Sequence, residues 1–106
     1  MKTDNDPAIY RFVLYTAGEN ASGQRAHQNL QSICNEYIPD KYSIDVLDLK
    51  SSPGIVLNEQ VLAVPMVIRK APPPEVRVIG DLSNRELAVR ALGIEKDMAS
   101  QTPGRV

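Results

Sequence analysis

The sequence contains very little cysteine, histidine or aromatic residue. Its 106 residues include one cysteine, one histidine, one phenylalanine, four tyrosines and no tryptophan. A single cysteine, Cys34, excludes an intramolecular disulfide and any C-x-x-C redox motif, and it fits a reducing compartment. The scarcity of aromatic rings predicts a core built mainly from aliphatic side chains.

The chain also lacks an excess of charge of either sign and a long apolar run. Twelve basic and thirteen acidic residues give a formal net charge of −1. We therefore expect no nucleic-acid partner, because phosphate backbones are bound by broad positive fields. The polar start and the absence of a run of membrane-spanning length predict a cytoplasmic protein without a membrane partner.

The composition that is present indicates one globular domain. The hydrophobic fraction is 42% and the charged fraction 24%, which argues against wholesale disorder. We expect a flexible N-terminus at residues 1–8, a single domain at residues 9–93 and a flexible, polar tail at residues 94–106.

Strand and helix patterns alternate in the first half of this domain. Residues 9–15 are almost continuously apolar, which predicts a strand in the middle of a sheet. The next segment predicts a helix that ends at Ile38-Pro39-Asp40, followed by a parallel strand at residues 42–49. The apolar face of this helix comprises Ala26, Leu30, Ile33, Cys34 and Tyr37.

The pattern is less regular after Ser51. Serine and proline at residues 51–53 favour a helix start, but three of the seven residues at 55–61 are β-branched, so helix and strand both stay open there. Residues 66–69 and 76–79 predict a hairpin. Its connection holds three successive prolines, for which we expect extended polyproline geometry.

The clearest local signal is Leu82-Ser83-Asn84-Arg85-Glu86-Leu87. Ser83 and Glu86 form a capping-box pattern, and Leu82 and Leu87 form the hydrophobic staple that accompanies it. We predict a helix capped by Ser83 and ended by Gly93 in a left-handed conformation. Its apolar face is predicted to comprise Leu87, Ala88, Ala91 and Leu92.

The predicted order of elements, βαβαββα, is that of a thioredoxin-like α/β domain. Pro65 stands just before the third strand, where thioredoxin-like proteins carry a cis-proline, although the sequence leaves the isomer open. An oxidoreductase of this fold needs a thiolate where the first strand passes into the first helix. Glu19-Asn20-Ala21-Ser22 stands there instead, so we expect no catalysis.

The remaining reactive side chains do not form a recognisable site. We expect Cys34 to be a buried core residue. His27 is expected on a solvated helix face, with no metal-site or triad pattern nearby, so no metal and no cofactor are predicted. Asp45 and Asp48 lie three apart on a strand and therefore on opposite faces, which predicts solvating edge charges rather than a carboxylate pair.

With these elements in place, the sequence resembles the KaiB family of circadian-clock proteins from residue 10 to residue 92. The resemblance rests on Leu14-Tyr15-Thr16-Ala17-Gly18, Arg25-Ala26, Val46-Leu47-Asp48-Leu49, Val64-Pro65, and above all Pro72-Pro73-Pro74 followed by Ile79-Gly80-Asp81-Leu82-Ser83-Asn84-Arg85-Glu86. This last block is long and specific.

The resemblance implies a regulatory protein without catalytic activity. Such proteins bind the ATPase ring protein KaiC, then capture KaiA and help to switch the output histidine kinases, in a clock or in a simpler timing or stress system. It also implies a metamorphic fold, with a resting KaiB arrangement (βαββααβ) and a rarer thioredoxin-like monomer that binds KaiC. We therefore expect a homo-oligomer, dimer or tetramer, in the resting state.

The same resemblance assigns roles to individual residues. It places partner binding at Asp45, Asp48, Leu57 and Gln60. From the local patterns and the resemblance together, we expect the determinants of the fold to be Pro65, Pro72, Pro73, Pro74, Gly80, Asp81, Ser83, Glu86, Ala91 and Gly93. Clock-type members carry basic residues at the positions that correspond to 45 and 60, whereas this chain has Asp45 and Gln60. This difference bears on the affinity and the identity of the partner. Clock-type members tend to carry glycine at position 91, where alanine favours a helix by up to roughly 1 kcal/mol, so we predict a preference for the thioredoxin-like state.

Two other functions stay open at this point. One is a thioredoxin-fold redox enzyme or peroxide sensor that uses Cys34. The other is a stand-alone equivalent of the sensory domain of a clock histidine kinase, which has the same fold, although the sequence shows no kinase helices.

Overall fold

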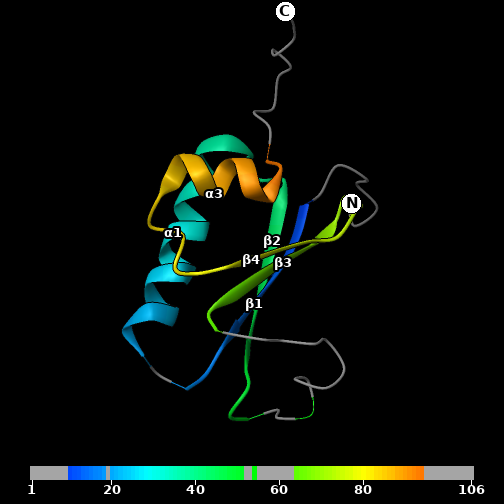
Figure 1. Ribbon diagram of the computed structural model, residues 1–106. Helices are drawn as coiled ribbons and strands as arrows, with labels where there is room; N and C mark the ends of the chain where they lie inside the picture. Colours follow the sequence, from blue (N-terminus) through cyan, green and yellow to red (C-terminus); the bar gives the residue numbers. More distant parts are fainter. Residues whose placement is uncertain (1–9, 19, 52–53, 55–63, 95–106) are drawn as a thin grey trace, which may run out of the picture.

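The computed structural model of the chain describes residues 10–18, 20–51, 54 and 64–94 (Figure 1). These residues form β1 (Tyr10–Thr16), α1 (Ala21–Tyr37), β2 (Tyr42–Asp48), β3 (Met66–Ala71), β4 (Val76–Ile79) and α3 (Arg85–Leu92). The segment at residues 55–61, with its open choice between helix and strand, lies outside the described residues. The predicted flexible ends, residues 1–8 and 94–106, also lie outside them except for residue 94. Residue 9 is likewise not described.

The described strands form one sheet in the order β2-β1-β3-β4. β1 pairs with β2 in parallel and with β3 in antiparallel orientation, and β3 and β4 form the predicted antiparallel hairpin. Figure 1 shows α1 and α3 on the same side of this sheet. The central position that we predicted for the first strand is confirmed.

β1 is buried on both faces because its apolar run leaves no polar side for solvent. Phe12 and Leu14 pack into the core beneath the two helices. Tyr15 turns to the opposite face, where it packs with Met66 and Ile68. The sheet therefore has an apolar cluster on each side.

α1 ends where its sequence predicts, and its start is capped by a side chain. The side chain of Asn20 accepts a 2.7 Å hydrogen bond from the main-chain N–H of Gly23, which satisfies one of the free donors of the first turn. The helix stops before Pro39, and the N–H of Ile38 bonds the carbonyl oxygen of Cys34. The predicted apolar face is confirmed, since Ala26, Leu30, Ile33 and Cys34 are buried and Tyr37 is half-buried.

The proline-rich connection differs from the prediction. The Val64–Pro65 bond is cis, as in thioredoxin-like proteins, but the Ala71–Pro72 and Pro73–Pro74 bonds are cis as well. A polyproline II helix consists of trans bonds, so the predicted extended connection between the hairpin strands is wrong.

α3 begins one residue later than predicted. Its capping residue is Asn84, whose Oδ1 accepts a hydrogen bond from the N–H of Leu87 at 3.1 Å. The N–H of Ser83 donates instead to Oδ1 of Asp81 at 3.0 Å. Leu82 adopts a left-handed conformation, with φ +62°, and this turn directs the chain into the helix one position further on.

The predicted staple is also wrong, whereas the predicted end of α3 is confirmed. Leu82 is buried in the core at 7% exposure, but Leu87 is 58% exposed. Of the four residues predicted for the apolar face, only Ala88 and Leu92 are buried, and Ala91 is exposed. Gly93 ends the helix with φ +67°, and the buried Ile94 extends the core past the predicted domain boundary.

Candidate functional site

The turn between β1 and α1 is where a thioredoxin-like redox enzyme would hold its thiol. Oδ1 of Asp48 accepts hydrogen bonds here from the N–H groups of Gly18, at 2.7 Å, and Lys50, at 2.9 Å. These two main-chain donors hold the pKa of Asp48 below its ordinary value, because they favour the charged carboxylate. Asp48 is therefore a structural acceptor of this turn, and our prediction of a solvating edge charge is wrong for it.

Cys34 is remote from that turn and is buried. Its side chain has 0% exposure and lies in the cluster beneath α1, as predicted. Burial raises the pKa of the thiol to about 12, so the thiolate that redox chemistry requires is almost absent at neutral pH. The hypothesis of a redox protein based on Cys34 has no geometric support.

Asp45, one of the predicted partner-binding residues, lies on the edge strand β2. Asp45 is exposed and pairs with Val13, whereas Asp48 pairs with Thr16 on the opposite face of the strand. The structure thus does not bring these two carboxylates together. Leu57 and Gln60, the other two predicted partner-binding residues, lie outside the described residues.

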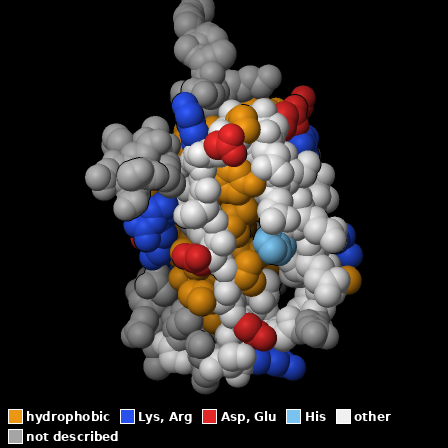
Figure 2. Space-filling view, turned by 180° about the vertical axis from the view of Figure 1, so that it is seen from behind, with side chains coloured by type: hydrophobic (Ala, Val, Ile, Leu, Met, Phe, Trp, Pro, Cys, Tyr) orange, Lys and Arg blue, Asp and Glu red, His pale blue; other side chains and the backbone are white. Residues whose placement is uncertain are grey.

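Two shallow grooves run between β2 and α1, and His27 lines both. The smaller, of about 140 Å³, contains Thr16, Gly23 and the 45% exposed Val46. The larger, of about 380 Å³, contains Asp40 and Tyr42. Figure 2 shows His27 at the surface beside a band of hydrophobic side chains, and the residue is half-buried there, on the helix face that we expected to be solvated. The residues next to His27 in the sequence do not show that it lies opposite β2. The sequence analysis therefore missed the surface between α1 and β2.

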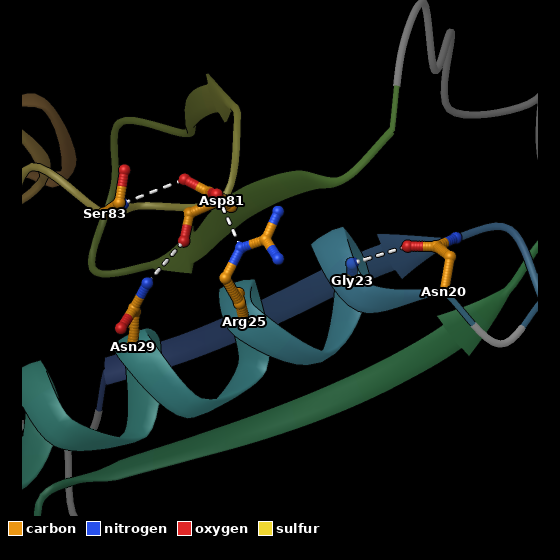
Figure 3. A network of polar contacts seen from close by, with 6 residues as sticks. All are labelled: Asn20, Gly23, Arg25, Asn29, Asp81 and Ser83. Carbon is orange, nitrogen blue, oxygen red and sulfur yellow. Dashed lines mark hydrogen bonds and ion pairs between the residues drawn. The ribbon is translucent and has the colours of Figure 1, made fainter.

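A polar network connects α1 to the loop before α3 (Figure 3). Nε of Arg25 donates to Oδ2 of Asp81 at 3.1 Å, and Nδ2 of Asn29 donates to the carbonyl oxygen of Asp81 at 2.8 Å. Hydrogen bonds from Arg25 and from Ser83 lower the pKa of Asp81. Arg25 and Asn29 are four residues apart, the spacing that places both on one helix face.

A second apolar surface lies between β4 and α3. A groove of about 200 Å³ is lined by residues that include Val78, Leu82 and Ala91. Ile79, 57% exposed, and Leu87 line it as well. Val46, Ile79 and Leu87 are the large hydrophobic side chains that the described residues leave exposed, and exposed apolar surface of this kind favours contacts with proteins.

Features of two other classes are absent from the described part of the chain. In the ranges given above, no three His, Cys, Asp or Glu side chains are grouped so that they could hold a metal ion. No helix formed by the described residues is long and apolar enough to cross a membrane.

Comparison with known sequences identifies one family. The KaiB domain family matches residues 13–94. Circadian clock protein KaiB3 of Synechocystis sp. is 35% identical over 81 residues, which are 76% of this chain and 79% of that protein. Circadian clock oscillator protein KaiB of Prochlorococcus marinus is 34% identical over 96 residues, 91% of this chain and 90% of that protein. The predicted resemblance is confirmed.

Comparison with solved structures identifies the fold. The N-terminal domain of Synechococcus elongatus SasA has a TM-score of 0.67 at 14% identity and covers 85% of this chain and 86% of its own. The oxidized form of mitochondrial thioredoxin 3 from Saccharomyces cerevisiae has a TM-score of 0.62 at 15% identity, with coverage of 80% and 78%. These likenesses concern the fold alone, and they confirm the thioredoxin-like α/β class.

Proposed function

Because the chain belongs to the KaiB family, we propose that it is a regulatory binding protein without catalytic activity, whose partner is a KaiC-like ATPase of a clock, timing or stress system. One observation carries this proposal: the family match spans a thioredoxin-like fold whose single cysteine is buried with a pKa of about 12. A thiol in that state favours a role in binding over a role in redox chemistry.

The outer edge of β2 is the proposed contact with the ATPase. β2 is an edge strand of the described sheet and exposes both Asp45 and Val46. A carboxylate at position 45 repels an acidic partner surface and attracts a basic one. We therefore expect the cognate ATPase to present a basic or neutral group at this point.

Complex formation tests the proposal directly. The purified chain is mixed with the KaiC-like ATPase of its own organism in the presence of ATP or ADP, and the mixture is analysed by size exclusion with light scattering. A co-eluting complex is the expected result. If no complex forms with either nucleotide at micromolar concentrations of both proteins, the partner assignment is wrong.

A charge reversal tests the proposed surface separately. Asp45→Lys should change the affinity for the ATPase several-fold, because it reverses a charge inside the interface. Glu75→Lys is the matched control, since it makes the same change of charge at an exposed site in the loop between β3 and β4, next to the opposite edge strand. If the complex forms and the two substitutions change its affinity equally, the contact with the ATPase lies elsewhere on the chain.

The family resemblance also supports a proposal about conformation and assembly. We propose that the chain has a second, oligomeric resting fold of the KaiB type, and that KaiA or a histidine kinase acts as a further partner where the host contains one. Secondary-structure NMR of residues 76–92, combined with sedimentation, tests the conformational part. A major species without helix at residues 85–92 would contradict our expectation that Ala91 and Gly93 favour the thioredoxin-like state.

A further inference from the structure

Arg69 on β3 is a buried cation between the sheet and the end of α3. Its side chain is on the helix side of the sheet and the residue is only 6% exposed. Nη1 donates to the carbonyl oxygens of Leu92, at 2.9 Å, and Gly93, at 3.2 Å, and Nη2 donates to the carbonyl oxygen of Pro74 at 2.9 Å. Nε has no hydrogen-bond partner in the described ranges.

Main-chain carbonyls compensate this buried charge. No carboxylate of the described residues lies within ion-pair distance of Arg69, although a buried cation is very unfavourable without compensation. The last carbonyls of a helix lack partners inside the helix and carry partial negative charge. Nη1 of Arg69 therefore supplies a donor to the free carbonyls at the end of α3. Nη2 supplies one to a carbonyl in the loop between β3 and β4.

The absence of a side chain at Gly93 allows Arg69 to approach it. A Cβ atom at position 93 would lie 2.6 Å from Nη1 of Arg69, well inside van der Waals contact. The φ angle of +67° independently disfavours any residue with a side chain. The residue that ends α3 therefore has two reasons to be glycine, and one of them is Arg69.

α3 is otherwise attached by apolar packing and by exposed polar contacts. The helix itself buries only Ala88 and Leu92. At its first residue, Arg85 donates to Oε1 of Glu36 at 2.7 Å, but both side chains are more than 40% exposed, so solvent screens this pair. The buried polar attachment is thus at the C-terminal end, through Arg69.

We propose that Arg69 is a latch that fixes the C-terminal end of α3 and the loop at residues 72–75 onto the sheet. When the latch is lost, α3 opens as a unit while α1 stays folded on β1. Arg69 is thereby a positioning residue for the groove between β4 and α3, because α3 forms one wall of that groove.

Native-state hydrogen exchange measured by NMR tests this proposal. The informative α3 probes are the amides of Ala88 in the helix and of Gly93 and Ile94 just after it, which donate hydrogen bonds to helix carbonyls. The amide of Ile38, which closes α1, is the comparison. Arg69→Met keeps the length and apolar bulk of the side chain but removes its charge and donors. We expect it to raise exchange of the α3 probes by about 30-fold and that of Ile38 by less than about 3-fold.

Two further variants keep the test decisive. Arg85→Met is the matched control, since it removes the exposed arginine from the other end of α3, and it should raise exchange of the same probes by less than about 3-fold. Arg69→Lys should give an intermediate increase, because an ammonium group cannot reproduce the fork of a guanidinium, and it serves if Arg69→Met does not fold. Unchanged α3 exchange, or an equal increase in α1 and α3, would overturn the proposal.

Discussion

The carboxylate of Asp48, at the end of β2, accepts a 2.7 Å hydrogen bond from the main-chain N–H of Gly18, two residues past the end of β1. A second bond, from the N–H of Lys50, closes the turn that leaves β2. The two strand ends are therefore held together by one side chain. In a thioredoxin-like redox enzyme this region is reserved for chemistry, whereas here its contacts are structural.

The Asp48 contact predicts an acid-dependent loss of stability. The pKa of Asp48 is lowered from its ordinary value of 3.8, so its charged form stabilises the folded protein above that value. This contribution is lost as the pH falls through the lowered pKa. Asp48→Asn, which keeps an acceptor oxygen but no charge, should be less stable than the wild type near neutral pH and should approach it at about pH 2.

Urea unfolding at a series of pH values measures this gap. Asp48→Ala, which removes the acceptor as well, should stay less stable than the wild type throughout the series. A gap between the wild type and Asp48→Asn that does not narrow on acidification would contradict the assignment of Asp48 as a charged acceptor in the folded protein.

Cys34 should be almost unreactive in the folded protein. With a pKa of about 12, only about one thiol in 10⁵ is ionised at pH 7, and the side chain is inaccessible. We expect a chromogenic disulfide reagent to label it more than about 100-fold faster in denaturant than in buffer. Rapid labelling of the native protein would revive the hypothesis of a redox sensor.

The helix cap provides a direct test of the corrected start of α3. Asn84→Ala should lower the free energy of unfolding by about 1 kcal/mol, because it removes the acceptor of the Leu87 N–H. Ser83→Ala should cost less, about 0.5 kcal/mol, because it keeps the main-chain N–H that bonds Asp81 and removes only an exposed side-chain hydrogen bond to the same carboxylate. A lower urea midpoint for Ser83→Ala than for Asn84→Ala would support Ser83 as the cap.

Elements with a clear apolar period were predictable from the sequence. β1 has no polar face, and the apolar residues of α1 recur at helical spacing, so Leu14, Leu30 and Ile33 could be assigned to the core. The edge position of Asp45 followed from the same reasoning. In these segments the local pattern and the tertiary environment agree.

Contacts between distant main-chain and side-chain groups were not predictable. Nothing in the spacing of Arg69 indicates that its guanidinium meets the carbonyl oxygen of Leu92, 23 positions later. The start of α3 was ambiguous because Ser83 and Asn84 are both good caps. The choice depends on the left-handed turn at Leu82, and that turn depends on how the core accepts the Leu82 side chain.

Leu82 and Leu87 should therefore differ sharply in their contributions to stability. Leu82 is 7% exposed and packs in the core cluster, so Leu82→Ala leaves a cavity and should lower the free energy of unfolding by about 2 to 4 kcal/mol. Leu87→Ala makes the same chemical change at a side chain that is 58% exposed, and should cost less than about 0.5 kcal/mol. Urea unfolding of both variants measures the two values under identical conditions. Similar losses would mean that Leu87 packs on Leu82 as the sequence pattern suggests, and that the groove between β4 and α3 is closed in solution.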